Sequence, residues 1–99
     1  MRILRTRQFD DWLKSLRDLR GRFKILTRIQ RMEDGNPGQT KSVGSGVFEM
    51  KVDFGPGYRV YFTQRGQVLV VLLCGGDKST QEKDIAKAKE LVIEWKEEE

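Results

Sequence analysis

The stretch from Val47 to Thr63, VFEMKVDFGPGYRVYFT, constrains the fold more than any other part of the chain. Apolar and polar residues alternate on both sides of Gly55-Pro56-Gly57. A strict period of two is typical of a β-strand with one buried face. Proline presets the first central position of a turn and glycine tolerates the positive φ of the second, so Pro56-Gly57 suits a type II turn. The stretch therefore predicts a β-hairpin.

Lys51, Arg59 and Tyr61 fall together on one face of this hairpin if its apolar rows point to the core. Two cations and a phenol on a rigid sheet suit the binding of a phosphate group. The outward face of a sheet must be polar in any case, and lysine and arginine are common there. From the pattern alone, an ordinary solvated surface is the simpler interpretation.

Length and composition fit one globular domain, which we expect to span residues 1–99. The chain has 99 residues, of which 37% are hydrophobic and 34% charged. Its longest apolar run, residues 68–74, is far shorter than the roughly 20 residues that cross a bilayer. Its start lacks the apolar core of a signal peptide. The single cysteine, Cys74, fits a small buried hydrophobe. We expect a cytoplasmic protein without a membrane partner.

The positive charge is concentrated in the first third of the chain. Residues 1–31 carry ten Lys or Arg against three Asp, a balance of +7, whereas residues 32–99 have a balance of −3. A basic segment next to an acidic tail indicates contact with a polyanion or with an acidic protein. Two solvated helices rich in arginine explain the same charges equally well.

Periodicity along the chain predicts the order β-α-α-β-β-β-α. Apolar spacing in the first third favours two helices separated by Gly21, the second burying Phe23, Leu26 and Ile29 and, less clearly, Ile25 and Met32. Residues 34–46, rich in Gly, Asn, Pro and Ser, read as a loop. Seven successive apolar residues predict a central strand ended by Gly75-Gly76. The expected elements are a strand at 2–6, helices from 9 and 22–33, the hairpin, a strand at 67–74 and a helix at 79–96 that starts with a Ser79–Glu82 capping box and buries Ile85, Ala88, Val92 and Trp95.

Composition also excludes several chemistries. The chain has no histidine and one cysteine, which rules out zinc sites built from His and Cys and catalysis by Ser-His-Asp or Cys-His. Scattered carboxylates make a two-metal hydrolase a poor fit. We expect neither a metal nor another cofactor. Cleavage of RNA by its own 2′-hydroxyl suits these limits, because lysine can move protons and arginine can brace the phosphate.

The chain resembles the RelE/ParE superfamily of toxins from type II toxin–antitoxin modules, particularly its HigB-like, phage-associated branch. The resemblance rests on four segments, of which GPGYRVYF followed by GGDKSTQ is the most specific pairing. It implies a RelE-like α+β fold of two layers, in which an N-terminal helical hairpin and a C-terminal helix pack on a curved antiparallel sheet. The segments are FDDWLKSLRD (9–18), RIQRMEDGNPGQTKSVGSGVFEMKVDFGPGYRVYF (28–62), VLLCGGDKSTQEKDI (71–85) and the helix that follows.

Many members of the superfamily cut mRNA in the ribosomal A site, and the resemblance carries their catalytic positions over in part. Lys51 matches a strand lysine, Arg59 the arginine after the hairpin turn, and Lys78 a frequent basic position, while Tyr61 is a weaker match for stacking or proton relay. Glu49 stands where some ribonuclease members carry a second lysine, and the tyrosine that some carry in the last helix is missing. Under this hypothesis the expected RNA-binding residues are Arg20, Arg22, Lys24, Arg28, Arg31 and Lys41.

Simpler structural roles stand beside these assignments. Lys78 fits a charged turn residue, Asp77 fits a turn or capping residue better than an acid catalyst, and Trp12 and Trp95 fit the core.

The incomplete catalytic set leaves three functions open. The leading hypothesis is a ribosome-dependent mRNA endonuclease. The alternatives are a ParE-like protein that poisons DNA gyrase, and an inactive relative that acts as a corepressor bound to its antitoxin. All three imply a cognate antitoxin that contacts promoter DNA through its own domain, while the first adds the ribosome and mRNA as partners.

Overall fold

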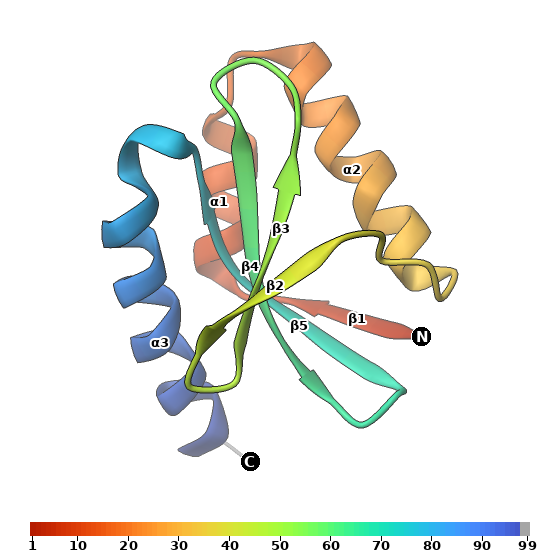
Figure 1. The fold of residues 1–99 in the computed structure, drawn as a ribbon, viewed down its shortest axis with the longest axis vertical. Helices are drawn as coiled ribbons and strands as arrows, with labels where there is room; N and C mark the ends of the chain where they lie inside the picture. The colour runs from red at the N-terminus through yellow and green to blue at the C-terminus, as the bar shows by residue number, and fades with distance from the viewer. Residues whose placement is uncertain (98–99) are drawn as a thin grey trace.

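The computed structural model describes residues 1–97, which form a five-stranded sheet, three α-helices and a short 3-10 helix (Figure 1). The end of the acidic tail, residues 98–99, lies outside the described residues. In chain order the elements are β1 (Arg2–Arg5), α1 (Arg7–Ser15), α2 (Leu19–Glu33), β2 (Thr40–Gly44), β3 (Val47–Val52), β4 (Tyr58–Arg65), β5 (Leu69–Gly76), η1 (Lys78–Thr80) and α3 (Gln81–Glu97).

The strands lie in the order β1-β5-β4-β3-β2. β1 is parallel to β5 and the other neighbours are antiparallel, so the α+β class is confirmed with a mixed sheet. The predicted hairpin is β3–β4, where Lys51 pairs with Arg59 and Glu49 with Tyr61. The apolar run forms β5, an interior strand between β1 and β4, although Gly75 and Gly76 continue the strand rather than end it.

The helices cover both faces of the sheet, so the domain has three layers in place of the two that the resemblance implies (Figure 1). α1 and α2 pack on one face, where Phe9 and Ile25 join a core with Met50 and Val60. α3 packs on the other face, where Ala88, Leu91 and Val92 form a second core with strand residues. The apolar stripe predicted for the last helix is confirmed, since Ala88 and Val92 are buried and Ile85 and Trp95 pack against this core.

A bulge in β5 shapes the second face. Tyr61 pairs with Cys74 and Phe62 pairs with Leu72, so Leu73 is an extra residue between them. Leu73 and Cys74 consequently both join the core under α3. Cys74 is buried, as the sequence predicts.

The break between the first two helices differs from the prediction. α1 ends at Ser15, and α2 begins at Leu19 with Asp18 as its N-cap, so Gly21 lies inside the helix. The Asp18 carboxylate accepts a hydrogen bond from the Gly21 N–H at 3.0 Å. A Cβ at position 21 would collide with the Tyr58 ring. Glycine is therefore explained by close packing and not by helix termination.

The buried side of α2 also differs in part. Ile25, Ile29 and Met32 face the sheet, but Phe23 and Leu26 are exposed. α2 carries apolar residues on two of its sides, and the periodicity does not show which side faces the sheet. The prediction that Phe23 and Leu26 are buried is therefore wrong.

Three local predictions differ from the structure: the loop at residues 34–46, the centre of the hairpin turn and the helix cap. Residues 40–44, predicted as loop, form β2 by pairing with β3. The hairpin turn closes through the Gly57 N–H and the Phe54 carbonyl at 3.1 Å, so Gly55-Pro56 occupies its centre in place of Pro56-Gly57. The capping box joins Asp77 to Thr80 and starts η1, in place of the predicted Ser79–Glu82 pair.

Among residues 1–97, no helix is long and apolar enough to cross a membrane.

Candidate functional site

Lys51, Arg59 and Lys78 border one hollow at the turn end of the β3–β4 hairpin. The hollow has a volume of about 350 Å³, and its remaining lining comes from residues 53–57 of the turn. Lys51 and Arg59 are brought together by strand register. Lys78 is brought close by η1, whose first N–H lies 3.4 Å from the Pro56 carbonyl. Three of the predicted catalytic side chains therefore meet in one place.

A second hollow of about 530 Å³ adjoins the first. It shares Lys51 and Arg59 with the first hollow, and it adds Lys41 from β2, Glu49 from β3 and Gln81 from α3. Four cations therefore border the two hollows, together with the carboxylates of Asp53 and Glu49. This excess of positive charge suits a polyanion.

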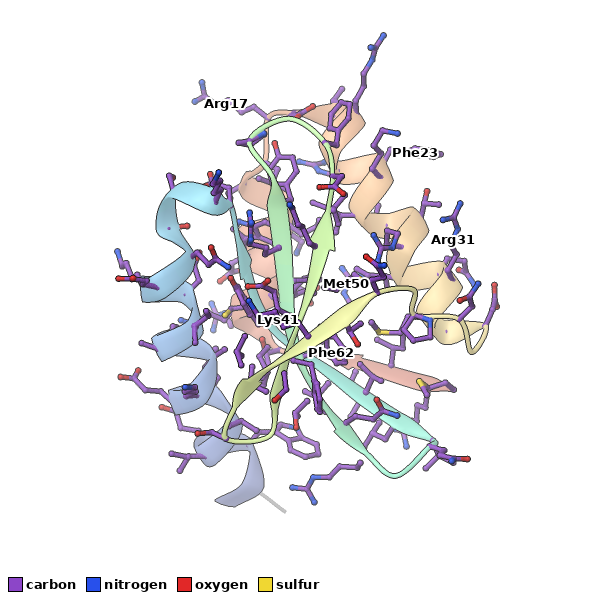
Figure 2. The ribbon with its side chains drawn as sticks, in the orientation of Figure 1. Arg17, Phe23, Arg31, Lys41, Met50 and Phe62 are labelled. Carbon is purple, nitrogen blue, oxygen red and sulfur yellow. The ribbon has the colours of Figure 1, made fainter. Side chains whose placement is uncertain are left out.

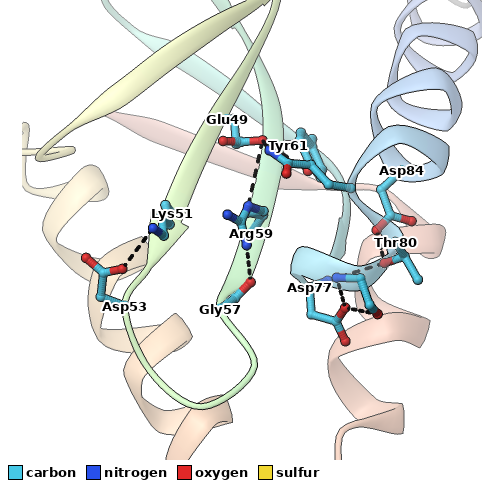
Figure 3. A network of polar contacts seen from close by, with 11 residues as sticks. Glu49, Lys51, Asp53, Gly57, Arg59, Tyr61, Asp77, Thr80 and Asp84 are labelled. Carbon is cyan, nitrogen blue, oxygen red and sulfur yellow. Dashed lines mark hydrogen bonds and ion pairs between the residues drawn. The ribbon is translucent and has the colours of Figure 1, made fainter.

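Arg59 is the buried member of this set. Its side chain is 7% exposed, and its Nη1 donates to the Gly57 carbonyl at 2.6 Å. The Nε atom lies 4.0 Å from Glu49 Oε2 and has no hydrogen-bond partner among residues 1–97 (Figure 3). The Nε atom is itself shut off from solvent, so a ligand in the hollow can approach Arg59 only through the rest of its guanidinium group.

Glu49 is the centre of the polar network beside Arg59. Its Oε2 accepts from the Tyr61 hydroxyl at 3.2 Å and from Gln81 Nε2 at 2.9 Å (Figure 3). Both Glu49 and Arg59 are buried. The carboxylate consequently links two strands and α3 around one guanidinium.

Tyr61 does not border either hollow. Its side chain is fully buried, so it has no exposed ring on which a base can stack. Burial, followed by the nearby negative charge of Glu49, raises the pKa of the Tyr61 phenol well above its usual value. In this structure the phenol stays protonated and donates to Glu49, which is a structural role, and the expected stacking or relay role stays a prediction.

The other ionic partners at the hollow are local. Lys51 is exposed and its Nζ lies 3.3 Å from Asp53 Oδ1. Asp77 accepts from the Ser79 N–H at 2.8 Å, which confirms it as a capping residue. Within residues 1–97 no three His, Cys, Asp or Glu side chains are grouped so as to hold a metal ion.

Comparison with known proteins identifies the family. Residues 11–93 match the family described as phage-derived protein Gp49-like. The chain belongs to this family. It is a family of RelE-like proteins associated with toxin–antitoxin modules. A Haemophilus influenzae protein, described only as uncharacterized, is 53% identical over 94 residues, which is 95% of each chain. No solved structure gave a significant match.

The predicted RNA-binding cations of this Gp49-like protein divide into two groups. Arg22 donates to the Leu16 carbonyl at 2.6 Å, and Arg28 donates to the Lys51 carbonyl at 2.8 Å. These two guanidinium groups tie α2 to the end of α1 and to β3. The remaining predicted side chains are exposed, namely Arg20, Lys24, Arg31 and Lys41.

Sequence reasoning missed two functional neighbours in the Gp49-like protein. Glu49 falls two residues before Lys51, so the strand alternation places it on the face that carries Lys51, but nothing in the pattern shows that it is buried against Arg59. Gln81 reaches the same carboxylate from α3, and no local pattern predicts that contact.

Proposed function

We propose that this Gp49-like protein is the toxin of a type II toxin–antitoxin module and that it cleaves mRNA on the ribosome without a metal. The observation that carries the proposal is the hollow bordered by Lys51, Arg59 and Lys78. Three cations from separate elements suit a phosphodiester, and the chain offers no histidine for alternative acid–base chemistry.

The reaction that fits is transesterification within the RNA. The 2′-oxygen forms a bond to the adjacent phosphorus and the bond from phosphorus to the 5′-oxygen breaks, which leaves a 2′,3′-cyclic phosphate and a 5′-hydroxyl. One proton leaves the 2′-hydroxyl and one reaches the 5′-oxygen. We assign Arg59 to the negative charge that develops on the phosphate, and exposed Lys51 and Lys78 to the two proton transfers.

The partners follow from the same proposal. Exposed Arg20, Lys24, Arg31 and Lys41 supply phosphate contacts that do not depend on base sequence, as binding to ribosomal RNA requires. The HigB-like branch remains the best proposal for its position in the superfamily. A toxin of this kind acts in the cytoplasm and is restrained by a cognate antitoxin, which binds promoter DNA itself.

The test is inducible expression in bacteria with mapping of mRNA 5′ ends soon after induction. Lys51→Ala and Lys78→Ala are the primary variants because both side chains are exposed and their loss leaves the fold intact. Arg59→Lys keeps a positive charge while it removes the guanidinium fork. Lys87→Ala, at a half-exposed lysine on α3 paired with Glu90, is the matched control. Circular dichroism of each purified variant checks folding.

In-frame cuts within translated regions are expected for the wild type and for Lys87→Ala, with a loss of at least about 100-fold in Lys51→Ala, Lys78→Ala and Arg59→Lys. Growth arrest with intact messages and broken DNA would replace the proposal with gyrase poisoning. Absence of both arrest and cuts would leave a corepressor as the function.

A further inference from the structure

Three large apolar side chains lie on the solvent side of α2 and are exposed. Leu19, Phe23 and Leu26 are 71%, 70% and 38% exposed. Their spacing of four and three residues places them in one row, about 10 Å long. We call this row the α2 stripe. Large apolar side chains clustered on a surface mark an interaction site, whereas scattered ones do not.

The charges that α2 itself carries beside the stripe are all positive. Residues 19–31 carry five Lys or Arg and no Asp or Glu. Arg22 and Arg28 donate to backbone carbonyls within the protein, whereas Arg20, Lys24 and Arg31 are exposed beside the stripe. Figure 2 shows Phe23 and Arg31 on the outer side of α2, pointing away from the sheet.

A hollow adjoins the stripe. It has a volume of about 310 Å³ and is bordered by Phe23, Lys24 and Arg31 of α2 and, from the sheet, by Val52 and Asp53. The Asp53 carboxylate lies 3.3 Å from Lys51 Nζ, so its charge is already paired within the protein. The surface thus combines an apolar row, a recess beside it and a border in which cations outnumber carboxylates.

We propose that the α2 stripe is the docking site for an acidic amphipathic helix of a protein partner. Such a helix presents apolar residues at i, i+3 or i+4, and i+7 to the row, with Asp and Glu on the side that faces the three exposed cations. The apolar contacts provide affinity and the carboxylates meet Arg20, Lys24 and Arg31. The proposal concerns binding alone and does not depend on RNA cleavage.

Two other occupants fit the surface less well. RNA binds to aromatic and basic side chains. Leucine neither stacks on bases nor forms hydrogen bonds with phosphates, so RNA binding does not explain the two leucines of the row. A second copy of the chain placed symmetrically on the stripe would bring Arg20, Lys24 and Arg31 against the same three cations. An acidic helix satisfies both the apolar row and its border.

The experiment is selection from a display library of helical peptides with randomised surface positions, using the purified full chain as target. Binders are counter-selected against Phe23→Ser, a change at an exposed position that leaves the core intact. Ile93→Ser on α3 is the matched control, because Ile93 is also exposed, at 58%, but lies on another element. We expect enriched peptides with Asp and Glu around apolar residues at helical spacing. Their affinity should fall at least about tenfold in Phe23→Ser and remain unchanged in Ile93→Ser.

Three further measurements decide between the occupants. The double reversal Arg20→Glu/Lys24→Glu should weaken the acidic peptides by about tenfold or more and should reduce the salt dependence of binding. Single-stranded RNA that displaces the peptide and binds more weakly to Phe23→Ser would overturn the proposal in favour of RNA. A dimer in sedimentation that Phe23→Ser dissociates would assign the stripe to a second copy. The proposal of an acidic helix would also be overturned if no enriched peptide depended on Phe23 for binding, or if the enriched peptides were basic.

Discussion

The Nε atom of Arg59 lies 4.0 Å from the Oε2 atom of Glu49, and both side chains are almost completely buried. The distance is too long for a hydrogen bond, and the two hydrogen bonds that Oε2 accepts come from Tyr61 and Gln81. Glu49 therefore neutralises Arg59 without using the Nε donor. A guanidinium held in this way is fixed in position and partly compensated in charge, while its Nε donor is buried without a hydrogen bond among residues 1–97.

Replacing Glu49 with Ala should destabilise the fold strongly. The change leaves the Arg59 charge buried without its counter-ion and removes the acceptor of the Tyr61 hydroxyl, so we expect the free energy of unfolding to fall by about 3 kcal/mol. Glu49→Gln keeps an acceptor oxygen and should lose clearly less. Urea unfolding of both variants measures the difference. Equal losses in the two variants would show that the charge, and not the hydrogen bonding, dominates.

The Asp18 carboxylate should make stability depend on pH in the acid range. Hydrogen bonds from the Gly21 N–H and then from the Tyr58 hydroxyl, at 3.0 and 2.8 Å, lower the pKa of Asp18 below its ordinary value of 3.8. A lowered pKa in the folded state gives stability that is present above the ordinary value and is lost as the pH falls through the folded value. Asp18→Asn should therefore be less stable than the wild type near neutral pH. That difference should shrink at about pH 2, and urea midpoints at the two pH values test it.

The hairpin, α2 and β2 show which parts of the structure can be predicted from the sequence and which cannot. The alternation in β3 and β4 predicted which residues share a face, because a strand has only two sides, and Lys51 and Arg59 met as expected. α2 carries apolar residues on two stripes, and only packing against the sheet decides that Ile25 is buried and Phe23 is exposed. β2 was missed because pairing of its backbone with β3 defines it, while its side chains are largely exposed.

Cys74 should be unreactive in the folded protein. Burial, and then the negative charge of Asp84, raises the pKa of its thiol to about 12, so almost no thiolate exists near neutral pH. We expect a disulfide reagent to modify the native protein far more slowly than the protein in urea. Comparable rates in the two states would contradict the burial of this side chain.

Gly75 should not tolerate a larger residue. It lies in β5 beneath Trp12, and a Cβ at this position would overlap the indole ring. We expect Gly75→Ala to lower the free energy of unfolding by about 1–3 kcal/mol, because the ring and α1 must shift. Combining it with Trp12→Leu should cost less than the sum of the two single changes, since the overlap is then relieved. Strict additivity in thermal or urea unfolding would show that the two residues do not share this contact.

Tyr61→Phe separates a structural phenol from a catalytic one. The Tyr61 hydroxyl donates to Glu49 at 3.2 Å in the buried network and does not border the hollow, so its removal takes one hydrogen bond from the fold. We expect a loss of about 1 kcal/mol in unfolding free energy. Cleavage of mRNA by purified protein in a translation reaction should fall by less than about tenfold, whereas loss of a direct proton relay costs about 100-fold or more. A large fall in cleavage with unchanged stability would return Tyr61 to the reaction and would require the phenol to leave Glu49 when RNA binds.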